Sequence, residues 1–264
     1  MMKLNNIHKT FNKGTINEKA ALQGLNLELK EGDFVTVIGG NGAGKSTMLN
    51  MIAGVYPVDE GSILIDGIDV TRKPDFKRAV YLGRVFQDPM MGTAADMEIQ
   101  ENLAMAYRRW KSRGIRWGIT AKERADYKEK LKILDLGLET RMSTKVGLLS
   151  GGQRQALTLL MATLQKPKVL LLDEHTAALD PKTAAKVLGQ TEKIVSENGL
   201  TTLMITHNMK DAIRLGNRLI MMHEGRIIYD VGGDEKKELH VSDLLAKFEE
   251  VSGEEFANDR MMLS

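Results

Sequence analysis

The pattern of hydrophobic and polar residues in the first part of the chain predicts short strands and one helix. Residues 25–29 alternate apolar and polar side chains, the period of two that is typical of a half-buried strand. Residues 34–38 are more uniformly apolar and lead into a glycine-rich turn. Residues 45–53 are helix-like and stop at Gly54. Residues 62–67 end in Asp-Gly, which suits the turn of a β-hairpin.

Helical patterns dominate the middle of the chain, and strands and helices alternate after it. Residues 96–138 are rich in Glu, Lys, Arg and Ala with repeated apolar positions, and a loop at 114–118 interrupts them. The later predicted elements are a helix at 153–164, a strand at 168–172, a helix at 181–197 and a strand at 201–206, with strand and helix alternating through residue 228. This alternation predicts an α/β fold in which helices cover a mainly parallel sheet.

We expect one domain over residues 1–231, with a helical lobe of about 88–150 inserted into it, and a helical tail over 232–264. Four apolar residues of the tail fall on one helical face: Val241, Leu244, Leu245 and Phe248. This face predicts a helix docked on the domain, and the alternative is a helix that binds a partner.

Composition and charge narrow the classes of function. The chain has 264 residues, of which 42% are hydrophobic and 27% charged, as in packed rather than disordered proteins. The net charge of +2 gives no reason to expect a nucleic-acid partner. The absence of cysteine excludes disulfides and thiolate metal sites. We expect neither a signal peptide nor a membrane span, because no apolar run approaches the about 20 residues that a span needs.

Residues 39–46 match G-x-x-x-x-G-K-[ST], a phosphate-binding motif, between a predicted buried strand and a predicted helix. There the backbone N–H groups of a tight turn and of a helix N-terminus converge on an anion. Lys45 would neutralise nucleotide phosphates, and the Ser46 hydroxyl would ligate Mg²⁺. A glycine turn that merely links strand to helix is the weaker alternative. The predicted phosphate-site residues are Gly39, Asn41, Gly42, Ala43, Gly44, Lys45, Ser46 and Thr47.

Residues 169–174 form an apolar strand that ends in two acids, Asp173 and Glu174. A buried strand has little reason to end in adjacent carboxylates unless a cation lies near them. Asp173 would hold Mg²⁺ through water, and Glu174 would orient and deprotonate an attacking water. Alone, the pair also fits the solvated end of a strand; with the phosphate motif it indicates a nucleoside triphosphatase.

Residues 149–157, Leu-Ser-Gly-Gly-Gln-Arg-Gln-Ala-Leu, closely resemble the signature of ATP-binding cassette (ABC) ATPases. Ser150, Gly151, Gly152 and Gln153 open a helix whose N-terminus suits an anion, although Ser-Gly-Gly alone is also a plain helix cap. Four more residues match family elements in the expected order: Phe11 at the adenine, Gln87 in the glutamine loop near the metal, Asp180 in the loop that crosses the dimer interface, and His207 as the switch histidine. Without these neighbours, Phe11 and His207 would also fit structural roles.

The resemblance covers residues from about 4 to 231. It implies a P-loop NTPase (RecA-like) core, mainly parallel, with an N-terminal antiparallel β lobe and the inserted helical lobe. It implies ATP and Mg²⁺ as cofactors, with Lys45, Gln87, Glu174 and His207 as catalytic residues and Ser46, Gln87 and Asp173 at the metal. Two subunits would pair head to tail, so that Ser150 and Gly152 of one chain face the γ-phosphate held by the other. We expect the second subunit to be an identical chain, and the alternative is a related cassette.

A stand-alone cassette of this kind resembles those of importers. The resemblance implies integral membrane permease subunits, an extracytoplasmic solute-binding protein, and a location at the cytoplasmic face of the membrane. Residues 88–103, with Met90, Met91 and Met97, would help to form the groove for the permease. Residues 173–181 also resemble ATPases of tryptophan or tyrosine uptake systems, which suggests an amino acid as cargo. The alternative is a soluble ABC ATPase that drives an assembly process such as iron–sulfur cluster biogenesis.

One residue departs from the family pattern. The position after Glu174 is usually proline, and here it is His175. A histidine leaves this turn an N–H group and a titratable ring. We expect a structural role for His175, and the alternative is pH modulation of hydrolysis.

Overall fold

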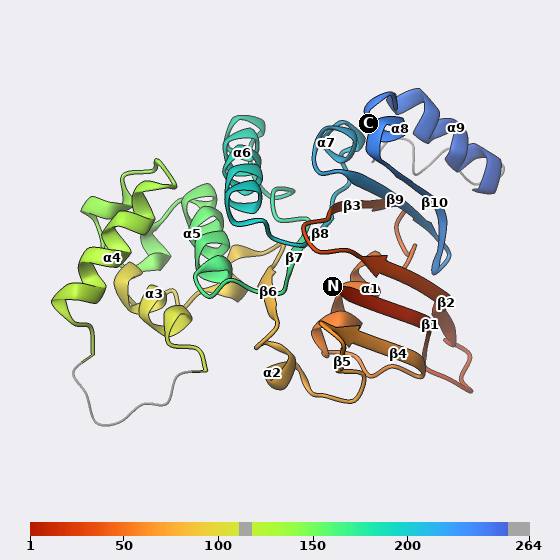
Figure 1. Ribbon diagram of the computed structural model, residues 1–264, viewed down its shortest axis with the longest axis horizontal. Helices are drawn as coiled ribbons and strands as arrows, with labels where there is room; N and C mark the ends of the chain where they lie inside the picture. The colour runs from red at the N-terminus through yellow and green to blue at the C-terminus, as the bar shows by residue number, and fades with distance from the viewer. Residues whose placement is uncertain (111–117, 253–264) are drawn as a thin grey trace.

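The computed structural model describes residues 1–110 and 118–252 and is built around a six-stranded sheet (Figure 1). In spatial order its strands are β10 (Arg226–Gly232), β9 (Arg218–His223), β3 (Phe34–Gly39), β8 (Thr202–Ile205), β7 (Val169–Asp173) and β6 (Leu82–Val85). All neighbouring pairs are parallel except β9 and β10. Along β7, Val169 and Leu171 pack in one core cluster, and Leu170 and Leu172 pack in another. Both faces of the sheet are therefore buried, and the predicted mainly parallel core is confirmed.

An antiparallel sheet of four strands forms the N-terminal lobe. It has the order β2 (Lys19–Leu29), β1 (Met2–Phe11), β4 (Glu60–Ile65) and β5 (Ile68–Asp69). Asp66 and Gly67, which join β4 to β5, have φ values of 55° and 77°. Positive φ at both turn positions is the geometry that Asp-Gly favours in a hairpin, so the predicted hairpin is confirmed.

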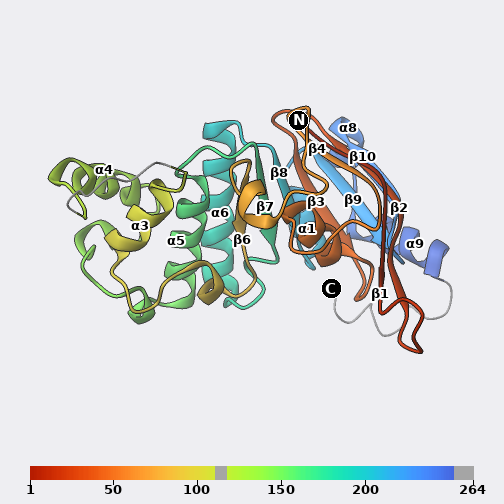
Figure 2. The same ribbon diagram turned by 90° about the horizontal axis from the view of Figure 1, so that it is seen from below.

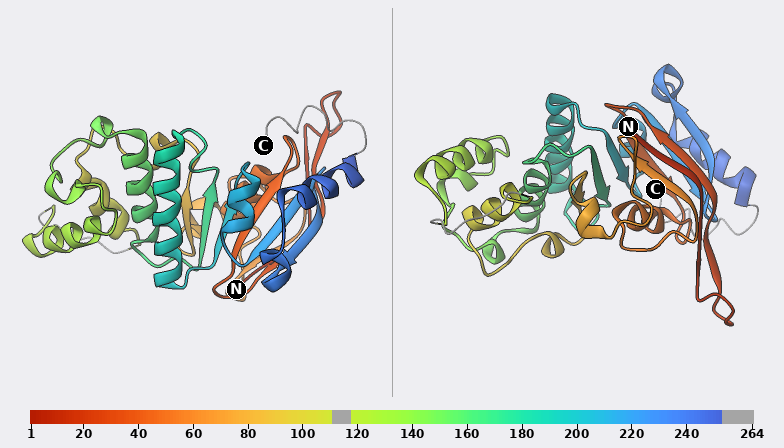
Figure 3. Two further views of the ribbon diagram at one scale, coloured as in Figure 1. Left: turned by 90° about the horizontal axis from the view of Figure 1, so that it is seen from above. Right: turned by 60° about the horizontal axis from the view of Figure 1, so that its bottom comes forward.

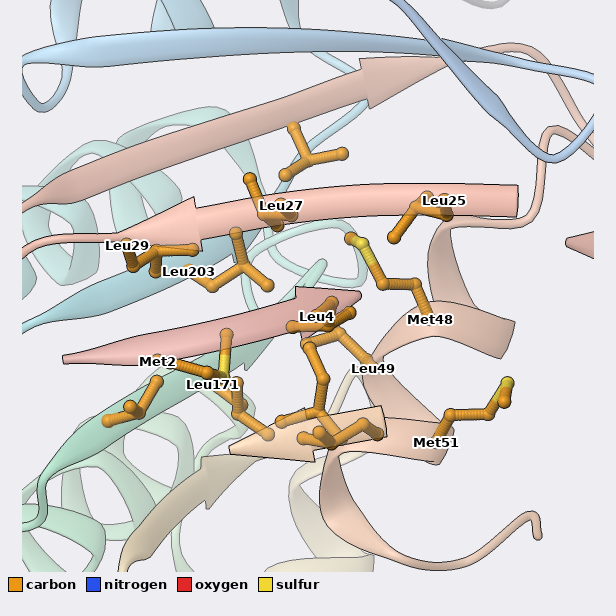
Figure 4. Packing of buried hydrophobic residues seen from close by; sticks show 14 of the residues in the cluster. Met2, Leu4, Leu25, Leu27, Leu29, Met48, Leu49, Met51, Leu171 and Leu203 are labelled. Carbon is orange, nitrogen blue, oxygen red and sulfur yellow. The ribbon is translucent and has the colours of Figure 1, made fainter. Parts of the chain in front are cut away.

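Helix α1 (Lys45–Ala53) lies between the two sheets and joins them in one core. Figure 4 shows Met48 and Leu49 of this helix among Leu4 and Leu27 of the antiparallel sheet and Leu203 of the parallel sheet. The helix ends where the sequence predicts, because Gly54 adopts a left-handed conformation at its C-terminus. A short helix, α2 (Asp75–Arg78), follows the β5 strand.

Four helices cover the opposite face of the parallel sheet: α3 (Ile99–Tyr107), α4 (Ala121–Lys132), α5 (Gly151–Thr163) and α6 (Pro181–Asn198). Figure 2 shows α6 and α5 next to the sheet and α3 and α4 farther out. The helical region predicted at 96–138 contains α3 and α4 in its described part, and three 3₁₀ turns lie in the same lobe: Pro89–Gly92, Leu138–Thr140 and Val146–Leu148. The predicted break at 114–118 lies outside the described residues, except for Gly118.

The C-terminal part packs on the edge of the sheet (Figure 3). After α7 (Met209–Arg214), the predicted alternation of strand and helix is wrong, because a turn at Glu224 and Gly225 joins β9 directly to β10. Helices α8 (Gly233–Lys237) and α9 (Val241–Ser252) follow, and α9 buries Leu244 and Phe248 in a cluster with residues of β3, β9, β10 and α7. Residues 253–264 of the predicted tail lie outside the described residues. No helix within residues 1–110 and 118–252 is both long and apolar enough to cross a membrane.

Candidate nucleotide site

The glycine-rich motif forms a tight loop between the end of β3 and the start of α1. Gly42 and Gly44 have φ values of 78° and 97°, a region that favours glycine. A Cβ atom at Gly44 would lie 2.6 Å from the carbonyl oxygen of Ala21, so a larger residue does not fit there. No side chain caps the N-terminus of α1 and no acid lies in its first turn. The loop therefore presents backbone N–H groups and a helix N-terminus that attract an anion.

Lys45 folds its side chain back onto this loop. Its Nζ donates to the carbonyl oxygens of Gly39 and Gly40 at 2.6 and 3.0 Å. The residue is only 6% exposed. The ammonium group thus lies against the loop that binds phosphate in the predicted site, and it can exchange these carbonyls for phosphate oxygens of greater negative charge.

A cavity of ≈ 500 Å³ brings most of the predicted site residues together. This volume is within the range of small-molecule sites, about 300–1,000 Å³. Two lining residues, Lys19 and Ala21, come from the start of β2 and were not predicted, because nothing in the sequence around them marks a site. The predicted residues that line the cavity are Phe11, Asn41, Gly42, Ala43, Gly44, Lys45, Ser46, Thr47, Gln87, Glu174 and His207.

Glu174 and His207 meet at one wall of this cavity. His207 Nε2 lies 2.5 Å from Glu174 Oε2. Glu174 has φ 46°, a left-handed conformation that is uncommon for glutamate and clusters at functional sites. Its backbone N–H is fixed by the carbonyl oxygen of Ile205 at 3.1 Å. Two loops that follow neighbouring parallel strands thus hold a carboxylate and an imidazole in contact beside the phosphate loop.

Asp173, at the end of β7, is half-buried behind this wall and does not line the cavity. Burial raises the pKa of Asp173, and the positive charge of Arg84 opposes that rise. Arg84 Nη2 lies 3.6 Å from Asp173 Oδ2, and both side chains are 15% exposed. Sequence reasoning missed Arg84, although an isolated arginine in the apolar strand β6 was a visible signal.

The oxygen donors near Lys45 fit Mg²⁺ only together with a nucleotide. Within the described residues, no three His, Cys, Asp or Glu side chains could hold a metal ion among themselves. The Ser46 hydroxyl, the Gln87 amide and the Asp173 carboxylate are hard oxygen ligands. Mg²⁺ usually binds through one or two carboxylates, waters and substrate phosphates, so this donor set fits the ion.

The signature residues lie away from this cavity. Ser150 caps α5: its Oγ accepts from Gln153 N at 3.3 Å, and Gln153 Oε1 accepts from Ser150 N at 3.2 Å. Gly152 is buried, and a Cβ atom there would overlap Thr183 Cγ2 of α6. Asp180 caps α6 by accepting from Thr183 N at 3.1 Å.

The starts of α5 and α6 therefore lie side by side. Their predicted residues Ser150, Gly151 and Asp180 are exposed, and Gln153 is partly buried. None of these, nor Gly152, lines the cavity that holds Lys45. The structure thus brings the predicted site residues of one chain into two separate groups, and only the group around Lys45 is assembled in a pocket.

Gln155 ties the two groups together and was not predicted as a site residue. Its Nε2 donates to the carbonyl oxygen of Phe86 at 3.0 Å, one residue before Gln87. The residue is fully buried. The signature helix is therefore fixed directly to the segment that carries Gln87.

His175 is a buried part of the packing behind Glu174. The residue is 1% exposed, and its Nε2 lies 3.0 Å from Thr191 Oγ1 of α6. The Thr191 hydroxyl donates to Val187 O at 2.9 Å, so its oxygen accepts from an Nε2–H tautomer of His175. Burial lowers the pKa of His175 to about 4. The ring is therefore neutral near pH 7, which supports the structural role.

A second cavity, of ≈ 410 Å³, opens between the parallel sheet and the helical lobe. We call it the lobe groove. Arg84 and Phe86 lie on its floor, and its predicted segment 88–103 contributes Met91, whereas Met90 and Met97 do not line it. Several apolar side chains at it are exposed: Val55 at 49%, Phe76 at 60% and Met91 at 70%. Arg109 and Met161 of the helical lobe also line the groove.

Comparison with known proteins identifies the family. The model of the ABC transporter family matches residues 22–177, more than half of the chain. The tyrosine transport ATP-binding protein of Clostridioides difficile is 43% identical over 249 residues, which cover 94% of this chain and 99% of that protein. The spermidine/putrescine import ATP-binding protein PotA of Haemophilus ducreyi is 34% identical over 230 residues. The match covers 87% of this chain and 57% of PotA.

Solved structures show the same fold. The post-hydrolysis dimer of the ATP-binding cassette MJ0796 with ADP and Pi superposes with a TM-score of 0.75 at 33% identity, covering 88% of this chain and 98% of that one. The ADP conformation of MJ1267, a cassette of an ABC transporter, gives a TM-score of 0.77 at 26% identity over 94% of this chain and 98% of that one. These matches cover most of the chain, and the pocket around Lys45 contains its phosphate-binding motif. The chain therefore belongs to the ATP-binding subunits of ABC transporters and is an ATPase.

Proposed function

We propose that this chain binds MgATP in the cavity around Lys45 and, as one of two such subunits, powers the import of an amino acid through separate membrane permease subunits. The observation that carries the ATPase site is the contact of Glu174 with His207 at 2.5 Å in the same cavity as Lys45. The similarity to a tyrosine transport protein supports an aromatic amino acid as cargo.

The phosphate loop and Lys45 bind the β- and γ-phosphates. Lys45 exchanges the carbonyl oxygens of Gly39 and Gly40 for phosphate oxygens, and the N–H groups of the α1 N-terminus donate to the same anion. Phe11, which lines the far side of the cavity and packs edge-on against Tyr56 at 5.2 Å, offers an aromatic surface to the adenine.

Ser46, Gln87 and Asp173 would hold Mg²⁺. The ion, when bound, neutralises charge on the phosphates. Ser46 and Gln87 line the cavity, and Asp173, which does not line it, would act on the ion through a water. The nearness of Lys45 to Asp173, which acts to lower the pKa of that carboxyl, supports this placement at the phosphate loop.

Glu174 acts as the general base and His207 positions the γ-phosphate. The Glu174 carboxylate lines the cavity and is fixed by its backbone, so it can orient a water and accept its proton. His207 donates from its imidazole to a γ-phosphate oxygen and exchanges Glu174 for that oxygen when the nucleotide enters. The proton that leaves the water is therefore accepted by Glu174, whose neighbour His207 binds the phosphate.

The second group of residues completes the site of a partner subunit. Ser150 and Gly152 lie at a helix N-terminus that does not line the cavity around Lys45, and Asp180 lies beside them at the start of α6. Two chains that pair head to tail place this N-terminus against the γ-phosphate held by Lys45 of the other chain. The two-chain structure of the similar cassette MJ0796 supports this pairing.

The lobe groove receives the permease, which holds the chain at the cytoplasmic face of the membrane, and a solute-binding protein outside the membrane delivers the cargo. The exposed apolar side chains Phe76 and Met91 support this use of the groove. Apolar patches on a soluble surface are typical of protein contact sites.

Reconstitution tests the function. We expect the tagged chain to co-purify with a polytopic membrane protein from detergent extracts. In proteoliposomes, we expect the complex to take up labelled tyrosine only when ATP is present on the side of the membrane that this chain faces. Met91→Glu should abolish co-purification while nucleotide binding persists. Met105→Glu is the matched control, because Met105 is exposed but does not line the groove. Recovery of soluble partners alone would favour the assembly ATPase over the transporter.

A further inference from the structure

Arg84 lies between two sites that the proposed function requires to communicate. The lobe groove and the nucleotide cavity are separate cavities. Arg84 lines the first, and its guanidinium faces Asp173, the residue before Glu174 of the second. Residues Leu82 and Arg84 of β6 point to the same side of the sheet as Leu171 and Asp173 of the neighbouring strand β7. The side chain therefore runs along one sheet face from the groove to the metal carboxylate.

Three contacts hold this guanidinium, each from a different element. Its Nη2 donates to Asn50 Oδ1 of α1 at 2.8 Å. Its Cζ lies 4.5 Å from the ring centroid of Phe86, which also lines the groove. Its Nη2 lies 3.6 Å from Asp173 Oδ2. Asn50 lies one helical turn after Ser46, so the contacts connect the groove, the phosphate-loop helix and the metal carboxylate.

The contact with Asp173 is the loosest of the three. A charge-assisted hydrogen bond is about 2.7–2.9 Å long, so at 3.6 Å the two charges attract without a formed bond. Arg84 Nε is buried and has no hydrogen-bond partner within the described part of the chain. A shift of less than about 1 Å would form the bond to Asp173. A small displacement of the guanidinium would therefore change its contact with Asp173.

We propose that Arg84 is a positioning residue that transmits occupancy of the lobe groove to the Asp173 carboxylate. An occupant that presses on the Phe86 ring moves the guanidinium stacked on it, and the guanidinium then draws Asp173 toward itself or releases it to the metal. Because Asn50 shares the same Nη2, the start of α1 follows the same movement. This inference rests on the proposed function, since it takes Asp173 as a metal ligand.

A plug in the groove tests the link without any permease. The chain has no cysteine, so Met91→Cys supplies one thiol to which a bimane group can be attached. The dissociation constant of Mn²⁺ is measured by electron paramagnetic resonance with a non-hydrolysable ATP analogue, for labelled and unlabelled protein. With Arg84 present, we expect the label to shift this constant by about fivefold or more, the lower range of allosteric coupling.

Arg84→Met should remove the effect of the label, and Arg84→Lys, which keeps the charge without the planar fork, should retain part of it. Arg109→Met is the matched control, because Arg109 lines the groove and its Nε is also buried, but no contact joins it to Asp173 in the described residues. An equal shift in Arg84→Met, or no shift in the parent chain, would overturn the proposal. Loss of nucleotide-dependent Mn²⁺ binding in the parent chain would instead overturn the proposed site itself.

Discussion

The substitution Glu123→Gln should weaken the helical lobe by an amount that depends on pH. Glu123 accepts two bonds from Arg108 Nη2, at 2.7 and 2.8 Å, and one from Thr120 N at 2.9 Å. These bonds join the end of α3 to the start of α4. A glutamine keeps the reciprocal bond to the helix cap, because either residue completes this capping box. The substitution therefore keeps the helix cap and removes both the negative charge and the acceptor oxygen Oε1 that face Arg108.

The size of the effect follows from the pKa of Glu123. Bonds from Arg108, then from Thr120, lower this pKa from 4.5 to about 2. That shift is equivalent to about 3 kcal/mol, which we reduce to about 2 kcal/mol because the side chain is 23% exposed. The folded pKa is the lower one, so this stability is fully present above pH 4.5 and is lost as the pH falls toward 2.

Urea unfolding, followed by tryptophan fluorescence, measures this effect. Both tryptophans, at positions 110 and 117, lie between Arg108 and Glu123 in the sequence. We expect Glu123→Gln to lower the free energy of unfolding by about 2 kcal/mol at pH 7, and by less than half of that at about pH 3. Glu129→Gln is the control: its pair with Lys132 is exposed and contributes at most about 0.5 kcal/mol. An equal loss at both pH values would refute the reasoning.

Three further substitutions test other parts of the structure. Arg78→Met should lower the free energy of unfolding in urea by about 3–5 kcal/mol, because this buried guanidinium donates to four backbone carbonyls, those of Met51, Ile52, Thr71 and Lys73. An unchanged free energy would show that other groups satisfy these carbonyls. Gly152→Ala should lower the melting temperature through overlap with Thr183 Cγ2, and Thr183→Ser should restore it; no rescue would place the cost elsewhere. His175→Pro should leave the shape of the ATPase pH profile unchanged from about pH 5 to 8, because burial lowers the pKa of His175 to about 4; a displaced profile would revive pH modulation.

The local elements were predictable because their signals are local. The strand before residue 39, the glycine loop and helix α1 follow each other without a gap, and Gly54 fixes the helix end by its own conformation. Asp66-Gly67 defines its hairpin in the same way. The alternation of strand and helix predicted through residue 228 failed at β9 and β10, because the short turn at Glu224 and Gly225 gave no sign that these two strands pair directly.

The contacts across the fold were not predictable from one sequence. Arg84 and Asp173 are far apart in the chain and meet only because β6 and β7 are neighbours in the sheet, an order that pairing between distant strands decides. Lys19 reaches the cavity for the same reason, through the antiparallel sheet packed on α1. In the sequence, Gln155 does not differ from the other polar residues of the signature helix, and only its bond to the carbonyl oxygen of Phe86 shows that it fixes this helix to the segment that carries Gln87.

The composite site is the central claim, and the mass of Glu174→Gln in solution tests it most directly. Light scattering with ATP and Mg²⁺ should show two chains per particle, because the bound nucleotide closes the pair and the missing base leaves it intact. Adding Ser150→Arg should return the particle to one chain while ATP binding persists. A single chain that binds ATP at full affinity in both variants would contradict the shared site.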